Sequence, residues 1–202
     1  MIRPAQKSDA IGIAMLHQRT LTNSFLAKLG IRFLESLYVF LVKKELVIVY
    51  AEGAAVKGFV SFSYNSSDMM KRFLFSCPAG VIKLLGLLIT SPALLKRLIE
   101  TYSAPFKSKT SLSSTTKVIL PDAELLSISV DPNCQNSGIG SQLLEVLENQ
   151  LKQCGIPEYK VIAGMSLDSA NKFYLSKDFT FASQITLHNN ELSNIYIKQI
   201  SI

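Results

Sequence analysis

The residues that could do chemistry gather in one short loop, Gln135-Asn136-Ser137-Gly138-Ile139-Gly140. An apolar and β-branched run, Glu124–Val130, precedes it, and apolar residues at helical spacing follow it up to Cys154. The two glycines remove side chains where a ligand would have to approach the backbone. The first turn of a helix has N–H groups without intrahelical partners, at the positive end of the helix dipole. The pattern favours an anion site, and pyrophosphate is a typical occupant.

The loop differs from two common phosphate-binding motifs. No Gly-Lys-Ser/Thr follows, which excludes a Walker loop, and the glycine spacing differs from that of a dinucleotide fingerprint. A glycine-containing turn without a ligand would have the same residues, so a purely structural turn stays open. His17 and His188 lie in no recognisable motif, and Cys134 has no visible activating partner, so we expect structural or bystander roles for all three. The three cysteines are odd in number and show no paired spacing, which predicts reduced thiols and no metal site.

The elements that must position the loop follow from the hydrophobic periodicity. After Ser8-Asp9 we predict a helix with Ile11, Met15 and Leu16 on one face. Further helices are predicted at 25–42, 139–154 and 169–177, and strands at 2–4, 45–51, 55–64, 124–130, 159–163, 179–188 and 194–200. This order predicts an α/β or α+β fold with a mixed sheet.

Length and charge limit the classes of function. A chain of 202 residues suits one domain, and 48% hydrophobic residues suit a globular protein. The net charge of +6 fits either a soluble basic protein or one with an anionic partner. No aromatic-interleaved basic motif or zinc-finger spacing supports nucleic acid, which leaves a phosphorylated small molecule as the better anion. The polar N-terminal stretch predicts no secretory signal, and hence a cytoplasmic protein.

Residues 66–106 form a second distinctive segment, which is apolar, basic and interrupted by prolines such as Pro78 and Pro92. We interpret it as a helical insertion between the third and fourth strands, followed by a Ser/Thr/Lys-rich linker at 107–120. Its longest apolar run is too short for a membrane span. Packing on the protein itself, a homodimer contact and membrane association all remain open for it.

The chain resembles a known family through four segments in order. Val130-Asp131-Pro132 followed by Gln135-x-x-Gly138-x-Gly140 resembles the acyl-CoA motif of the GNAT superfamily of N-acyltransferases, Gln/Arg-x-x-Gly-x-Gly/Ala after the fourth strand. The other similar segments are Ile2–Pro4 with Asp9, Val56–Val60, and Ala170–Tyr174 with Phe179. The resemblance implies a single acyltransferase domain over 1–202, with a mixed, mostly antiparallel sheet flanked by helices. It also implies acetyl-CoA as donor and no metal.

The resemblance implies roles for individual residues in a direct attack of an amine on the thioester. Glu124 matches the place of a base glutamate in some GNAT enzymes, although it could be a solvated carboxylate. Tyr174 matches the usual general-acid tyrosine, or else is a core aromatic. The expected cofactor contacts are Ile128, Ser129, Val130, Gln135, Asn136, Ser137, Gly138, Ile139, Gly140, Ser141, Asn171 and Lys172.

Two departures from the family pattern bear on function. The family usually has Gly where Asp178 stands, and an Asn is missing near Leu167 and Asp168. We expect an N-acetyltransferase that acts on a primary amine of a small molecule or amino sugar. A protein or peptide N-acetyltransferase and a catalytically degenerate acyl-CoA-binding regulatory module are the alternatives.

Overall fold

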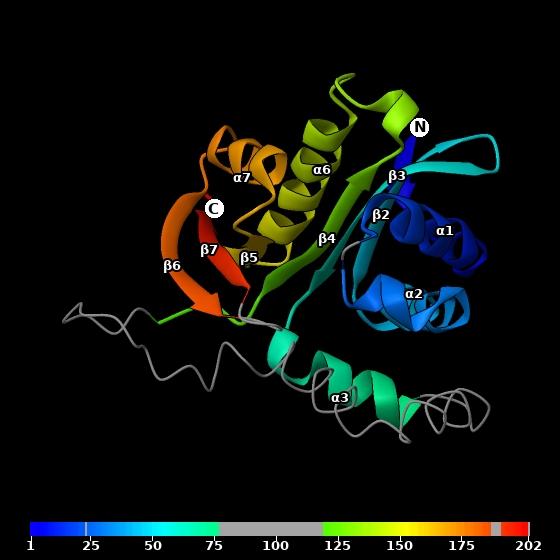
Figure 1. Ribbon diagram of the computed structural model, residues 1–202, viewed down its shortest axis with the longest axis horizontal. Helices are drawn as coiled ribbons and strands as arrows, with labels where there is room; N and C mark the ends of the chain where they lie inside the picture. The colour runs from blue at the N-terminus through cyan, green and yellow to red at the C-terminus, as the bar shows by residue number, and fades with distance from the viewer. Residues whose placement is uncertain (23, 77–118, 187–190, 202) are drawn as a thin grey trace. The chain divides into compact units, whose positions relative to one another are not determined.

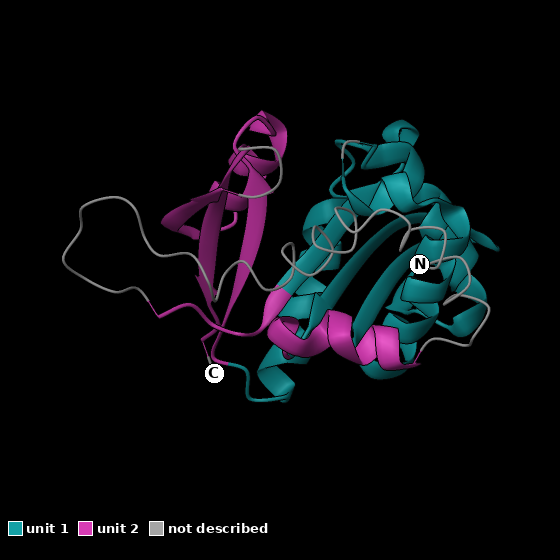
Figure 2. Ribbon diagram, turned by 60° about the horizontal axis from the view of Figure 1, so that its bottom comes forward, with its two compact units in different colours: residues 1–64, 125–156, 202 teal, residues 65–124, 157–201 magenta. Residues whose placement is uncertain are grey.

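The computed structural model describes residues 1–22, 24–76, 119–186 and 191–201 (Figure 1). Internal contacts divide the chain into two compact units (Figure 2). The first unit comprises residues 1–64 and 125–156, and the second comprises residues 65–124 and 157–201. Each unit contains part of the sheet and its own helices, and each is described separately below.

The first unit has helices on both faces of its strands. Its strands follow the order β1 (Ile2–Pro4), β2 (Leu46–Glu52), β3 (Ala55–Ser63) and β4 (Glu124–Val130), and its helices are α1 (Ala10–Thr20), α2 (Ile31–Lys44) and α6 (Ile139–Gln153). β1 pairs with β2, and β2 with β3, in antiparallel register. Phe59 stacks on His17 of α1, whereas its neighbour Gly58 faces Ile139 of α6. Since adjacent strand residues point to opposite faces, α1 and α6 cover opposite faces, as Figure 1 shows.

The described residues of the second unit form three antiparallel strands and two helices. Its strands follow the order β5 (Glu158–Gly164), β7 (Leu192–Gln199) and β6 (Thr180–Thr186), and its helices are α3 (Ser66–Ser76) and α7 (Asp168–Leu175). β7 lies between β5 and β6 because it pairs antiparallel with both. The predicted C-terminal hairpin is therefore confirmed in its two strands, and residues 187–190 lie outside the described residues.

The fold class predicted from the sequence is confirmed, since the seven strands form a mixed, mostly antiparallel sheet with flanking helices. One amphipathic assignment was wrong. Leu16 is buried on α1 as expected, but Ile11 and Met15 are exposed, and Ala10, Ile13, Ala14 and His17 complete the buried face. The predicted helix at 25–42 is interrupted at Gly30, where a φ of 89° ends a 3₁₀ turn (Leu26–Leu29) before α2 begins.

The predicted insertion is described only at its start. α3 lies between β3 and β4 as expected, whereas residues 77–106 of the insertion and 107–118 of the linker lie outside the described residues. The single domain over 1–202 thus stays a prediction. None of the helices that the structure describes is long and apolar enough to cross a membrane.

His17 is a buried histidine that links α1 to the segment before α2. Its Nδ1 lies 2.7 Å from the Tyr38 hydroxyl and its Nε2 lies 3.0 Å from the Ser24 hydroxyl. The side chain is 1% exposed, and burial lowers its pKa from 6.5 to about 4. The structural role expected for this residue agrees with these contacts, whereas His188 lies outside the described residues.

This burial predicts that the free energy of unfolding falls in mild acid. The unfolded chain takes up a proton on His17 below pH 6.5, while the folded chain resists protonation until about pH 4. The contribution of neutral His17 to the free energy of unfolding is therefore fully present above pH 6.5 and is lost on acidification. At about pH 4.5 the free energy of unfolding is lower by about 2–3 kcal/mol. Denaturant titrations at about pH 7 and about pH 4.5 measure the loss. His17→Gln should remove most of this slope, and an unchanged slope in that variant would refute the assignment.

Candidate active site

The glycine loop of the first unit leaves a helix end open. Gly138 is the N-cap of α6 with a φ of 82°, a left-handed conformation that favours glycine, and no side chain caps the helix. The first α6 backbone bond runs from Gln142 N to Gly138 O (3.0 Å), so the N–H groups of Ile139, Gly140 and Ser141 precede it. A Cβ on Gly138 would have Gln142 Nε2, at 3.8 Å, as its nearest neighbour. The loop therefore offers backbone donors and free space to an anion.

The loop is held in shape by its own polar groups. Gln135 Nε2 donates to Val130 O (3.2 Å), and Ser137 Oγ donates to Cys134 O (2.5 Å). Asn136 adopts a positive φ of 59°. The side chains of Gln135, Asn136 and Ser137 are exposed, whereas Ile139 is buried. The structure thus fixes the loop through local bonds and leaves the amides of the first helical turn at its surface.

Asp131 is a buried carboxylate at the start of this loop. It accepts hydrogen bonds from Asn133 N (3.1 Å) and Arg19 Nη2 (2.8 Å), and Lys57 Nζ lies 3.4 Å away. The Asn133 amide, together with Lys57 and Arg19, lowers the pKa of Asp131. Its backbone N also donates to Lys57 O (2.7 Å). The loop is therefore anchored to both α1 and β3.

The end of β4 carries three expected cofactor contacts. Ile128, Ser129 and Val130 close the strand, which reaches the loop through Asp131. Ser129 is buried, and its hydroxyl donates to Thr20 Oγ1 of α1 (2.7 Å). This bond and the Arg19–Asp131 ion pair hold the last turn of α1 beside the end of β4.

In the second unit, the Asn171 side chain is a hub of hydrogen bonds. Its Nδ2 donates to Gly164 O (2.9 Å) and Leu167 O (2.8 Å). Its Oδ1 accepts from Asn194 Nδ2 (3.0 Å) and the Tyr196 hydroxyl (2.7 Å). These bonds tie α7 to β5 and β7 and occupy the amide, whereas neighbouring Lys172 is exposed. Of the two predicted contacts on α7, Lys172 therefore presents the more accessible side chain.

Tyr174 lies within an aromatic cluster of the second unit. Its ring contacts Phe179 edge to face (centroids 5.3 Å apart) and lies 6.1 Å from the ring of Tyr196. Only 5% of the residue is exposed, and burial raises the pKa of its hydroxyl well above 10.0. The hydroxyl is therefore protonated throughout the neutral range, as a proton donor must be.

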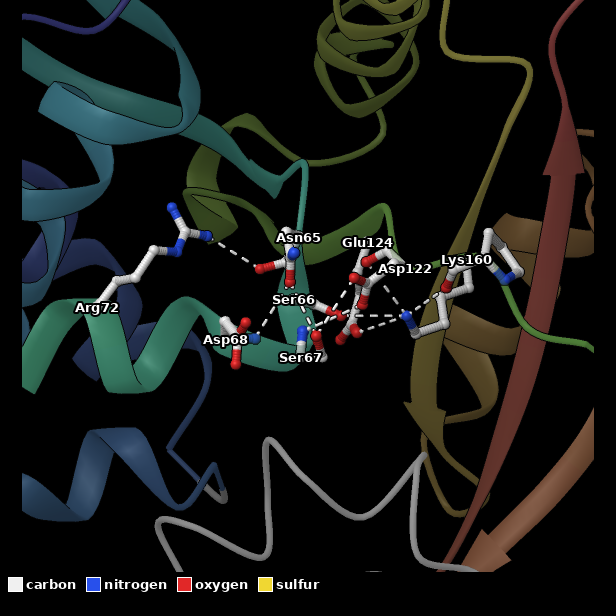
Figure 3. Close-up of polar contacts among 9 residues, drawn as sticks. Asn65, Ser66, Ser67, Asp68, Arg72, Asp122, Glu124 and Lys160 are labelled. Atoms are coloured by element: carbon white, nitrogen blue, oxygen red, sulfur yellow. Dashed lines mark hydrogen bonds and ion pairs between the residues drawn. The ribbon is translucent and has the colours of Figure 1, made fainter.

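Glu124 is paired with a buried lysine of the same unit. Lys160 Nζ lies 3.3 Å from Glu124 Oε2, with side chains 3% and 12% exposed respectively (Figure 3). Lys160 also donates to Ser66 Oγ (3.1 Å) and Pro121 O (2.5 Å). A solvated carboxylate was one interpretation of Glu124, but the ion pair instead holds it in a fixed, largely buried position.

The contacts of Lys160 extend to the start of α3. The backbone carbonyl of Asp122 also accepts a hydrogen bond from Lys160. The side chain of Asp122 accepts a hydrogen bond from the backbone N–H of Ser67 (3.2 Å). Asn65 Oδ1 accepts from Asp68 N (3.2 Å), and Arg72 Nη2 donates to Asn65 O (3.0 Å). Figure 3 shows this cluster joining the beginning of α3, the segment before β4 and the interior of β5.

Two groups in these sites were missed by the sequence reasoning. Lys160 interrupts the apolar strand Glu158–Gly164, and a lone charge there is a signal for a buried ion pair. Asp131 belonged to the recognised motif, but its partners Arg19 and Lys57 left no local signal. Within the part of the chain that the structure describes, no group of His, Cys, Asp or Glu residues could hold a metal ion.

One family model matches part of the chain. The model of the acetyltransferase (GNAT) family matches residues 116–181, which include Glu124, the glycine loop and Tyr174. Residues 116–181 thus match a GNAT acetyltransferase domain. The match also covers Asp178, one of the two departures from the family pattern. No curated protein sequence matches the chain.

Solved acetyltransferase structures have a similar fold. An N-acetyltransferase from Staphylococcus aureus Mu50 is 17% identical, with 98% of this chain and 100% of that chain covered, at a TM-score of 0.63. The ribosomal-protein-S18-alanine N-acetyltransferase from Escherichia coli is 16% identical, with 100% of this chain and 94% of that chain covered, at a TM-score of 0.61. The PaiA N-acetyltransferase from Thermoplasma acidophilum, in complex with coenzyme A, is 14% identical, with 98% of each chain covered, at 0.58. At these identities the likeness establishes the fold.

The departure from the family pattern at Asp178 has a structural basis. Asp178 adopts a positive φ of 59°, the conformation for which glycine, usual in the family here, is best suited. Aspartate tolerates this conformation better than most residues. Lys198 Nζ lies 3.7 Å from its carboxylate, and Phe179 beside it is buried. The substitution therefore leaves the turn after α7 intact.

Proposed function

We propose that this GNAT protein transfers an acetyl group from acetyl-CoA to a primary amine of a small molecule or amino sugar. The observation that carries the donor assignment is the open N-terminus of α6 after Gly138. There the N–H groups of Ile139, Gly140 and Ser141 would bind pyrophosphate, aided by the helix dipole. The backbone of Ile128–Val130 would bind the pantetheine arm, and Lys172 is an exposed cation for a phosphate or the arm.

In the proposed reaction the amine attacks the thioester carbonyl directly, so that a C–N bond forms as the C–S bond breaks. Glu124 would take the proton of the ammonium, directly or through water, and the ion pair with Lys160 fixes its position. Tyr174 would give its proton to the leaving thiolate, since its hydroxyl is protonated at neutral pH. The products are an amide and free CoA thiol.

Thiol release from acetyl-CoA in the presence of separate acceptors tests this proposal. Small amines and amino sugars form one panel, and peptides with different N-terminal residues form the other. We expect turnover with members of the first panel and only background hydrolysis with peptides. Because one structural neighbour is named as acting on a ribosomal protein, turnover confined to peptides is the alternative outcome and would refute the acceptor class.

Two further results of the same assay separate the remaining possibilities. Binding of acetyl-CoA without turnover on either panel would indicate a regulatory module. With a responding amine, Glu124→Gln should lose activity near neutral pH and regain it at high pH, where the amine is already neutral. A wild-type pH profile in this variant would exclude Glu124 as the base.

A further inference from the structure

The carboxylate of Asp131 poses an electrostatic problem for an anion site. Its side chain is 4% exposed and begins the turn Asp131–Cys134 that leads into the loop. Gln135, the first loop residue, donates back to Val130 O beside Asp131. The charge therefore lies within about one Debye length, ~10 Å, of the loop. An uncompensated carboxylate at this distance would repel a polyphosphate ligand.

Two cations compensate this carboxylate, and they come from different elements. Arg19 is in the last turn of α1, and only its Nη2 contacts Asp131, at 2.8 Å. Its side chain is 58% exposed, which leaves the other guanidinium N–H groups accessible to a ligand. Lys57 Nζ lies 3.4 Å from the same Oδ2 atom. Two cations and one carboxylate leave a net charge of +1.

The position of Lys57 depends on an irregularity in β3. Tyr50 pairs with Gly58 and Ala51 with Val56, so Lys57 is the extra residue of a β-bulge. Bulges redirect a side chain out of the regular alternation of a strand. The carbonyl of Lys57 accepts the backbone N–H of Asp131, and its ammonium reaches the carboxylate of the same residue. The bulge therefore presents both groups of Lys57 to the start of the loop.

We propose that Arg19 and Lys57 are donor-site residues that overcompensate Asp131 and make the loop attractive to the phosphates of the acyl donor. This inference rests on the proposed assignment of the loop as the pyrophosphate site. Arg19, with its accessible guanidinium, is the member able to contact a phosphate. Asp131 has a positioning role, since it holds both cations and the first turn of the loop.

Calorimetric binding of two donors to the full chain tests this proposal independently of turnover. Acetyl-CoA carries phosphates, whereas S-acetyl-pantetheine has the same thioester arm without them. We expect Arg19→Gln and Lys57→Gln each to weaken acetyl-CoA binding roughly tenfold at low salt, and the double variant to weaken it further. S-acetyl-pantetheine binding should stay unchanged, and the acetyl-CoA differences should shrink at high salt. Arg32→Gln, in α2, makes the same change in net charge and should have no effect.

The order of the acetyl-CoA affinities among these variants distinguishes an electrostatic effect on the ligand from a purely structural role in anchoring the loop. The triple variant Arg19→Gln/Lys57→Gln/Asp131→Asn restores neutrality, so it should bind acetyl-CoA like the single variants and more tightly than the double variant. If the double variant fails to fold, the two single variants decide. Unchanged acetyl-CoA affinity in both, or an equal loss for both donors, would overturn the proposal. If instead Gly138→Glu left acetyl-CoA binding intact, the loop assignment itself would be wrong.

Discussion

Replacing Gly138 by glutamate should abolish acetyl-CoA binding, with a rise in Kd on the order of 10³-fold. A carboxylate here would occupy the space before the first turn of α6 and face the bound pyrophosphate. At about 4 Å, and with an effective dielectric constant of about 20, two like charges repel by ~4 kcal/mol, which corresponds to about 10³-fold in affinity. Isothermal titration calorimetry with acetyl-CoA measures the effect.

The backbone conformation of Gly138 calls for a matched control. Its φ of 82° would strain any residue with a side chain, by ~1–2 kcal/mol for most types. Asparagine tolerates this conformation and adds no charge, so Gly138→Asn should lose much less affinity than Gly138→Glu. Both variants should keep the fold, because the nearest neighbour of a Cβ at this position is 3.8 Å away. Wild-type affinity in the glutamate variant would disprove the site.

For Tyr174→Phe, kcat should fall by ~10²–10⁴-fold while the affinity for acetyl-CoA stays nearly constant. The substitution removes only the hydroxyl, so the ring contacts with Phe179 and Tyr196 remain. Because burial raises the pKa of this hydroxyl, the wild-type enzyme should lose no activity through Tyr174 ionisation between neutral and mildly alkaline pH. Steady-state kinetics with a responding amine, together with calorimetry for the donor, gives both quantities.

Tyr196→Phe is the matched control within the same aromatic cluster. Its hydroxyl donates to Asn171 Oδ1 (2.7 Å) and accepts from Asn194 Nδ2 (3.2 Å), so its loss removes two part-buried hydrogen bonds, at a cost of ~1–3 kcal/mol in stability. We expect lower stability and nearly normal kcat for this variant. If the two variants lose kcat equally, the Tyr174 hydroxyl acts through packing or folding, and the general-acid role is refuted.

Several features of the fold could be predicted because they depend on neighbours in sequence. The strand Glu124–Val130 was predicted with the bounds observed, and the helix predicted to follow the loop matches α6 to within one residue. Apolar residues four apart, such as Leu143 and Leu147, are buried as the periodicity indicated. The α1 prediction erred because Ile11 and Met15 are apolar but exposed, and periodicity alone does not say which side of a short helix meets the sheet.

The order of residues specifies the loop, its strand and its helix, and with them the resemblance to the GNAT family. Local spacing sufficed there, since a glycine loop ahead of a helix makes an anion site from its own backbone. The charges that surround the loop depend instead on the folded arrangement of the chain. Asp131 meets Arg19 across 112 positions and Lys57 across 74, while Glu124 meets Lys160 on another strand. Such pairs exist only once the chain has folded, because Coulomb attraction and burial depend on distances in space and leave no periodic pattern along the sequence.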